Sequence, residues 1–406
     1  MSSATFSQER VDGYLLRKQH LAPRTQGADI VQIVEDICAL HSTVPSSPYL
    51  SLWSRVNALD PESLDVELYE TRRLVRLLCM RRTLHVVASE QLPIFFQALR
   101  TRREGEALRQ VRKVLVLAGM CREGEEEAIL RDLLDRVMEV LGVRGPSTVA
   151  ELGRVIPALR ATVKYSSNKP YAGEFSLGSR LVPAMCALGL AVRTRPRGTR
   201  RSNLHTYAAM AEWLPDVDLE SISPEAAQTE LLRCYLAAFG PATLDDAEWW
   251  TGLSKTEISK ARESLAEELE TVFIEGLEGE YLMLADDAQR LRGFVPAEGS
   301  CVCLLPELDP YIMGYRGRRR LLAPEHSAKV FDRAGNAVRT VWVNGKVVGA
   351  WSLRKDGSVA CGLFQHAGEE ESGLLEREVR RLEGFLRGES LSQRMHTPFT
   401  RALLQT

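Results

Sequence analysis

The 406-residue sequence contains no apolar run near the ~20 residues that span a membrane, and its start, "MSSATFSQER", lacks the apolar core of a signal peptide. The eight cysteines form no Cys-x-x-Cys pair, and the seven histidines show no His-Glu-x-x-His or comparable ligand spacing. Cys301 and Cys303 flank Val302 in an apolar run, which favours a buried strand over a metal site. We therefore expect a cytoplasmic protein, not embedded in a membrane, that holds neither a metal nor another cofactor.

Lysine is scarce as well: nine of the 52 basic residues are lysine and the other 43 are arginine. The planar guanidinium of arginine fits phosphates and base edges, although codon bias also explains such a ratio. The net charge is only -2, so the positions of the arginines have to decide between these explanations.

No heptad repeat and no exposed apolar helix marks a dimer surface, so we expect a monomer.

A pattern of helices followed by two β-prone runs occurs three times in the chain. Each copy should end in a hairpin, at residues 73–88, 190–210 and 270–286. The helices before the hairpins are expected at 7–21, at 28–40 and from Ser47; at 126–142, from Ser147 and at 174–190; and at 223–240, 243–253 and 254–269. Helices followed by a two-stranded wing are typical of winged helix-turn-helix modules, which we place at 1–110, 111–215 and 216–295.

The periodicity changes from about residue 296 to short strands separated by turn residues. "DRAGN" (332–336) is a tight-turn signal, and Asn344-Gly345 is the preferred pair for a two-residue hairpin. A final helix is expected at 369–388. The sequence thus predicts an α+β fold, in which three tandem winged helix-turn-helix modules precede a small β-rich, barrel-like C-terminal domain at 296–406.

Two basic hairpins are candidate DNA contacts. The wing of the second module, "RPRGTRR", carries Arg195, Arg197, Arg200 and Arg201, and such a wing can lie along phosphates or enter the minor groove. A solvated loop is the alternative interpretation. The wing of the third module, "EGLEGEY", is acidic and would repel phosphate, so the three modules do not all hold DNA through their wings.

The hairpin of the first module, "MRRTLHVV", brings Arg81, Arg82 and His85 close together in sequence. Strand alternation puts His85 on one face with Thr83, on a hairpin that can meet nucleic acid. The alternative is a partly buried histidine that satisfies backbone groups.

A third candidate lies in "LLPELDPYIMGYRGRRR" (304–320). Asp309 follows a buried-looking strand, and Pro310 makes the chain turn there. Tyr311, Arg316 and Arg318 follow, which indicates a DNA-binding lip. An aspartate before proline is also a routine turn starter, so both interpretations stay open.

The stretch "ALHSTVPSSPYLSLWSRV" (39–56) raises a separate question, because His41, Ser42 and Thr43 occupy a tight junction before a helix. These side chains either cap a helix or face a substrate. Ser47 is expected to cap the following helix, with Pro48 at its first position, and this weakens the capping interpretation for Ser42 and Thr43.

These segments together resemble the AlkZ/YcaQ-like DNA glycosylase family over nearly the whole chain. The resemblance depends on the stretches at 39–56, 80–87, 235–253, 304–318 and 330–351. It implies a fold of tandem winged helices. It also implies an enzyme that excises bulky N-alkylated purines from double-stranded DNA, in DNA repair or in self-resistance to genotoxins. The family carries a Gln-x-Gln or Gln-x-Asp motif at the end of its second helix, where this chain has His41 and Thr43. An acid that commonly follows the motif is replaced here by Val44.

The resemblance makes His41 and Thr43 the candidate catalytic pair. Hydrolysis of an N-glycosidic bond passes through an oxocarbenium-like sugar, and an alkylated purine is already cationic and leaves without a general acid. His41 is then the base for the attacking water, with an ordinary pKa near ~6.5, and Thr43 orients the same water. The imidazole has to be neutral, so activity should fall below that pKa.

The sequence therefore favours a monofunctional DNA glycosylase, because no lysine near the motif is available for Schiff-base chemistry. The alternative is a non-catalytic winged-helix DNA-binding protein, either a damage sensor or a transcriptional regulator. A protein-interaction scaffold is the third possibility.

Overall fold

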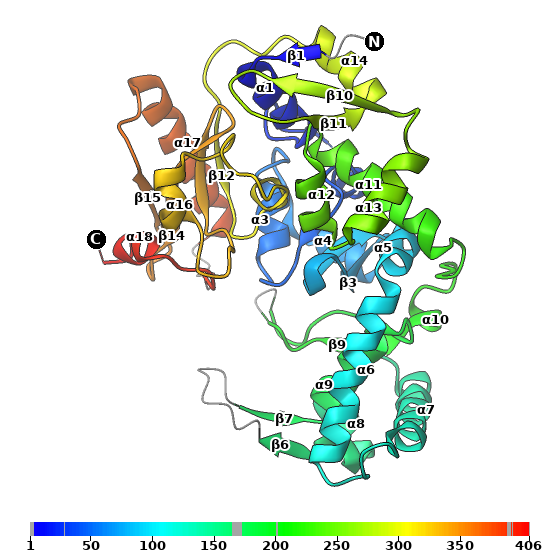
Figure 1. Cartoon of the computed structure of the whole chain (residues 1–406). Helices are drawn as coiled ribbons and strands as arrows, with labels where there is room; N and C mark the ends of the chain where they lie inside the picture. Colours follow the sequence, from blue (N-terminus) through cyan, green and yellow to red (C-terminus); the bar gives the residue numbers. More distant parts are fainter. Residues whose placement is uncertain are drawn as a thin grey trace. The chain divides into compact units, whose positions relative to one another are not determined.

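The computed structural model describes residues 4–27, 29–164, 173–199, 202–387, 391 and 393–405. The chain divides into two compact units (Figure 1). Unit 1 combines residues 1–65 with residues 228–406, and unit 2 is the intervening segment 66–227. Their boundaries fall within helices α4 (Pro61–Tyr69) and α11 (Pro224–Phe239). Within the described ranges, no helix is both long and apolar enough to cross a membrane.

The first two helices of unit 1 begin at polar caps. The helices of this unit, beyond the two boundary helices, are α1 (Gln8–Lys18), α2 (Ile30–Asp36), α3 (Ser47–Trp53), α12 (Leu244–Thr251), α13 (Lys255–Ser264), α14 (Ala285–Gly293), α15 (Pro310–Met313), the 3-10 turn η3 (Pro324–His326), α16 (Ser327–Val330), α17 (Glu369–Leu386) and α18 (Pro398–Ala402). Ser7 accepts a hydrogen bond from the Arg10 N–H and caps α1 as expected. Helix α2 ends at Asp36, earlier than predicted, because Cys38 adopts a left-handed φ of 69°.

The helices predicted for the third module are confirmed as α11, α12 and α13. Thr243 and Ser254 begin α12 and α13, and each forms a reciprocal capping box with the acid three residues later. The predicted hairpin is also confirmed, as β10 (Leu269–Ile274) antiparallel to β11 (Tyr281–Leu284). A strand that the sequence did not predict, β1 (Ala4–Phe6), pairs parallel to β10.

The C-terminal part of unit 1 contains a four-stranded antiparallel sheet in the order of the sequence. Its strands are β12 (Val302–Leu305), β13 (Thr340–Val343), β14 (Lys346–Leu353) and β15 (Val359–Leu363). Asn344 and Gly345, both with positive φ, form the predicted turn between β13 and β14. In the described residues β12 and β15 are the two edges and do not pair with each other, so the expected barrel is not confirmed: the sheet is open.

Helices cover both faces of this open sheet. On one face, α3 and α17 pack their apolar side chains against the strands; the core there consists of Leu50, Trp53, Leu304, Val341, Trp351, Leu353, Val359, Leu382 and Leu386. On the opposite face, the Ser352 hydroxyl donates to the carbonyl of Thr400 in α18. Coverage by helices removes the need for the strands to curl into a closed barrel.

Unit 2 is built around a second antiparallel sheet and a long helix. Its strands are β3 (Leu74–Leu78), β4 (Leu84–Ala88), β5 (Ser147–Thr148), β6 (Thr162–Lys164), β7 (Glu174–Ser176), β8 (Ala191–Arg193) and β9 (Thr206–Ala209). Its helices and 3-10 turns are η1 (Met80–Arg82), α5 (Leu92–Ala98), α6 (Arg100–Leu117), α7 (Glu126–Arg144), α8 (Val149–Val155), η2 (Pro157–Arg160), α9 (Gly178–Ala187) and α10 (Met210–Trp213). Strand neighbours run β4-β3-β8-β9-β5, and β6 pairs with β7 separately.

The predicted hairpins β3–β4 and β8–β9 are confirmed in unit 2. Two local predictions were wrong. The N-cap of α8 is Thr148, which exchanges hydrogen bonds with Glu151, whereas Ser147 lies in β5. The helix expected at 174–190 is shorter, because Glu174–Ser176 form β7 and α9 spans Gly178–Ala187. Pro183 lies inside α9, where burial of the apolar face against α6 and α7 outweighs the lost backbone bond.

Candidate active site

The turn at His41–Thr43 lies in unit 1, between the two-residue strand β2 (Leu40–His41) and α3. The Thr43 N–H donates a hydrogen bond of 3.4 Å to Nδ1 of His41. The imidazole is buried, with 7% of its residue exposed, and Thr43 is half-buried. Because Nδ1 accepts this bond, the neutral ring carries its proton on Nε2. The structure thus brings the two candidate catalytic residues together through the backbone of one of them.

Ser47 does not cap α3, contrary to prediction. The N-cap position is taken by Ser46, which makes no side-chain capping bond, and Pro48 is the second residue of the helix, one position later than expected. The Ser47 hydroxyl instead donates to the backbone carbonyl of Glu307, at 3.0 Å. Ser47 therefore links α3 to the segment that follows β12 and does not cap the helix.

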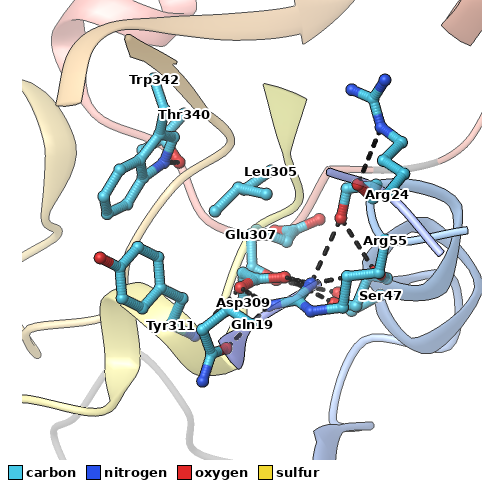
Figure 2. A network of polar contacts seen from close by, with 12 residues as sticks. Gln19, Arg24, Ser47, Arg55, Leu305, Glu307, Asp309, Tyr311, Thr340 and Trp342 are labelled. Atoms are coloured by element: carbon cyan, nitrogen blue, oxygen red, sulfur yellow. Dashed lines mark hydrogen bonds and ion pairs between the residues drawn. The ribbon is translucent and has the colours of Figure 1, made fainter. Parts of the chain in front are cut away.

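Asp309 and Tyr311 are fully buried in unit 1. The carboxylate of Asp309 accepts two hydrogen bonds from the Arg55 guanidinium, at 2.8 and 2.9 Å, and one from the Ser51 hydroxyl, at 2.8 Å (Figure 2). Tyr311 stacks on Trp342 with ring centroids 5.0 Å apart, and burial raises its pKa well above the ordinary value. The binding-lip interpretation finds no support in these positions, because neither side chain reaches the surface.

The arginines after Tyr311 have different surroundings. Arg316 is exposed, and its backbone N–H donates to Asp246, the residue that closes the capping box of α12. Arg318 is half-buried, with its guanidinium 3.5 Å from the ring centroid of Phe331. DNA contact stays a prediction for both arginines, and Arg316 is the more accessible one.

Unit 2 holds the second group of predicted DNA contacts. Arg81 and Arg82 are exposed at the β3–β4 connection, where both have left-handed φ angles of 52° and 58°. His85 is buried at the start of β4, with Nδ1 3.1 Å from the carbonyl of Thr83 and 3.5 Å from Sγ of Cys79. Burial lowers the pKa of His85 to about 4, with a smaller contribution from the charge of Arg81, although the hydrogen bond to the Thr83 carbonyl opposes the shift. The exposed arginines can meet DNA, whereas the buried imidazole has the environment of a structural residue.

The wing between β8 and β9 carries Arg195 and Arg197, both more than half exposed. Arg195 lies 3.3 Å from Glu70, and Arg197 lies 3.2 Å from Glu151. Arg200 and Arg201 lie outside the described residues. Exposed pairs of this kind contribute little to stability, so both guanidinium groups can exchange their carboxylates for phosphates at small cost.

Two buried charges near the candidate site were missed by the sequence reasoning. Arg55 and Glu307 are at most 1% exposed, and both belong to the network around Asp309 (Figure 2). The available signal was the spacing of Ser47, Ser51 and Arg55, which puts three polar residues on one face of a helix. No cluster of three or more metal-ligating side chains occurs in the parts of the chain that the structure describes.

The fold defines the general class of the protein. The structure of Streptomyces sahachiroi DNA glycosylase AlkZ superposes with a TM-score of 0.73 at 24% identity, and the match covers 94% of this chain and 97% of that one. The chain thus has the α+β fold of that glycosylase. The sequence profile of the DNA glycosylase AlkZ-like family matches residues 34–385, and the chain belongs to this family. An interstrand DNA cross-link repair glycosylase from Streptomyces sahachiroi is 26% identical over 361 residues, which cover 86% of this chain and 88% of that protein.

Proposed function

We propose that this protein is a monofunctional DNA glycosylase that removes bulky N-alkylated purines from double-stranded DNA, with His41 and Thr43 at the water site. The observation that carries the proposal is the hydrogen bond from the Thr43 N–H to His41, which orients the ring at the junction where family members have their catalytic pair. The role is DNA repair or self-resistance to an alkylating genotoxin, carried out in the cytoplasm by a monomer.

The tautomer of His41 changes the role that the sequence suggested for this residue. A neutral ring protonated on Nε2 cannot take a proton there, so it donates a hydrogen bond to the oxygen of the water instead of acting as its base. The Thr43 hydroxyl accepts a hydrogen bond from the same water and aims a lone pair at the sugar. A base is dispensable because the cationic purine has largely departed before the water attacks, and the proton is lost to solvent afterwards.

Protonation of His41 would oppose this chemistry in two ways. It would place an N–H on Nδ1 against the N–H of Thr43 and break the bond between them. It would also set a cation beside the positively charged sugar. Base release should therefore decrease under acidic conditions in which the imidazole takes up a proton.

The helices followed by hairpins are winged helix-turn-helix modules in this proposal, and they bind the duplex through arginine. Arg195 and Arg197 on the β8–β9 wing, and Arg81 and Arg82 on the β3–β4 connection, are the exposed cations that support it. Guanidinium groups on hairpins suit phosphates and the minor groove.

The test incubates the protein with a duplex that carries one N7-alkylguanine and measures free base in a single turnover. The native protein should release base, and Thr43→Ala should lower the rate by about 10- to 100-fold, since one misplaced group costs roughly this much. His41→Gln restores a neutral amide at the family's position, so it should retain release and lose the pH dependence. His366→Ala, at an exposed histidine, is the matched control.

The outcomes separate the proposal from its main alternative. Native release that persists undiminished in His41→Ala and Thr43→Ala would show that the water site lies elsewhere. Absence of release by the native protein, together with salt-sensitive DNA binding, would instead support a non-catalytic damage sensor or regulator.

A further inference from the structure

Helix α3 buries a row of polar side chains along one face. Ser47, Ser51 and Arg55 are four residues apart, so they project from the same side of the helix and of its C-terminal extension. Each is at most 1% exposed. Leu50 and Trp53 lie between them in sequence and pack into the apolar core against the four-stranded sheet. A polar row buried beside an apolar one needs specific partners, because unpaired polar groups are costly away from water.

Most partners of this row outside the helix lie in the segment 307–309, and Arg55 also donates through Nη2 to the side-chain oxygen of Gln19, at 3.2 Å. The Ser47 hydroxyl donates to the Glu307 carbonyl at 3.0 Å, and the Ser51 hydroxyl donates to Oδ2 of Asp309 at 2.8 Å. Arg55 donates through Nη1 to Oδ2 and through Nη2 to Oδ1 of the same carboxylate (Figure 2). The eight residues from the first contact to the last correspond to about 12 Å of helix. Contacts at three heights fix both the translation of α3 along its axis and its rotation.

The segment that receives these bonds is itself held firmly. Leu308 has a φ of 61°, a conformation that a leucine keeps only when its surroundings enforce it. The Glu307 carboxylate accepts the backbone N–H groups of Arg394 and Met395, at 3.0 and 2.7 Å, and lies 3.6 Å from the Arg339 guanidinium. The segment can therefore serve as a fixed reference for α3.

The candidate water site lies directly before this helix. Thr43 precedes the first residue of α3 by four positions, so a rotation or shift of α3 moves the turn that carries the imidazole. We propose that Asp309, with Ser51 on α3 and Arg55 directly after this helix, positions His41 and Thr43 for the reaction without touching the substrate. This inference rests on the proposed function for its chemistry, and on the buried contacts of unit 1 for its geometry.

Buried ion pairs of this kind specify an arrangement more than they add stability. Replacing both partners of such a pair with apolar residues of similar size often leaves a protein folded, whereas removing one partner strands a charge. Asp309→Asn or Arg55→Ala alone would therefore confuse unfolding with mispositioning. The informative variant is the double replacement Arg55→Met/Asp309→Leu, which removes the directional bonds and keeps the volume.

Arg320→Met/Asp12→Leu is the matched control. This pair is also buried in unit 1, with 3.2 Å between its charged atoms, and it does not involve α3. Asp12 also contacts Lys346, whose side chain is 39% exposed and can turn to solvent when the carboxylate is removed. Both double variants should unfold cooperatively. A difference between them in base release or in the His41 resonances then results from which ion pair was removed, and not from loss of the fold.

Two measurements on the native protein and both variants test the inference. In single-turnover assays on alkylated duplex, Arg55→Met/Asp309→Leu should bind within about threefold of native and release base about 100-fold more slowly, as expected for a displacement near 1 Å. The control should match native. In 15N-histidine NMR, the His41 resonances, assigned with His41→Gln, should move in the first variant and stay in place in the control.

The outcomes distinguish this inference from the proposed function. Native-like His41 resonances or native-like release in Arg55→Met/Asp309→Leu would overturn the positioning role. Lack of base release by the native protein would count against the proposed function, and the NMR comparison would still decide whether Asp309 sets the position of His41.

Discussion

His85 is 6% exposed in unit 2, and burial lowers the pKa of its imidazole to about 4. His205 in the same unit behaves alike, with a pKa of about 4 that results from burial and from the neighbouring charges of Arg76 and Arg193. An unfolded imidazole takes up its proton near ~6.5. Between that pH and about 4 the unfolded state binds more protons than the folded state, so the stability of the fold decreases as the pH falls through this window.

We expect His85→Gln to reduce this loss of stability. From pH 7 to pH 4.5 the native protein should lose about 2 to 3 kcal/mol through His85 alone, and the variant should not. Urea unfolding followed by circular dichroism at several pH values measures the difference. His366→Gln changes an exposed ring and should leave the native pH dependence in place. Equal slopes for native protein and His85→Gln would show that His85 is protonated in the folded state.

At the scale of elements, the β13–β14 turn shows how tightly unit 1 is packed around short connections. Gly345 has a φ of 80°, and a Cβ added there would lie 2.9 Å from the Cβ of Asp12 in α1. Gly279, between β10 and β11, also has a positive φ, of 96°, but a Cβ there would meet nothing within 4 Å. Substitutions at these two glycines therefore distinguish the cost of backbone strain alone from the cost of strain together with a steric clash.

Gly345→Ala should destabilise the protein more than Gly279→Ala. Both substitutions force a Cβ into left-handed backbone, at about 1–2 kcal/mol, and only Gly345→Ala also displaces α1. Thermal unfolding under one set of conditions compares them. A larger loss for Gly279→Ala would mean that α1 yields easily at its contact with the turn.

Elements fixed by local chemistry could be predicted from the sequence, and those fixed by distant partners could not. The Asn344-Gly345 turn, the three hairpins and the capped helices follow from residues that are near each other in the chain. The burial of Asp309 depends on Arg55, 254 residues earlier, and the spacing of Ser47, Ser51 and Arg55 fits a solvated helix face equally well. The tautomer of His41 follows from the position of the Thr43 backbone N–H, which cannot be deduced from the sequence.

At the scale of the whole molecule, the net charge of -2 gives no general attraction to DNA. Binding to a polyanion therefore has to come from local groups of arginine. On the β8–β9 wing, Arg195 and Arg197 form surface ion pairs with Glu70 and Glu151, and the Arg195 guanidinium also lies 4.7 Å from the ring centroid of Tyr69. These are the side chains that phosphate can most readily recruit.

Arg195→Gln/Arg197→Gln should weaken binding to alkylated and unmodified duplexes equally. Each lost phosphate contact lowers the slope of log affinity against log salt by about 0.9, so the double variant should lose about 2. Binding titrations at salt concentrations from about 50 to about 200 mM measure this slope. Arg377→Gln/Arg380→Gln removes the same charge from exposed positions on α17 and should keep the native slope. A matching decrease in that control would mean that net charge, and not the wing, governs binding.

The two-segment construction of unit 1 has a consequence during synthesis. Arg55 leaves the ribosome 254 residues ahead of its carboxylate partner Asp309. At about 5–20 residues per second, α3 waits roughly 10 to 50 seconds for the segment that orients it. The wing arginines of unit 2 are made within that interval. The water site that we propose is consequently not held in place until residue 309 has been made, and a chain truncated before Asp309 should release no base from alkylated DNA.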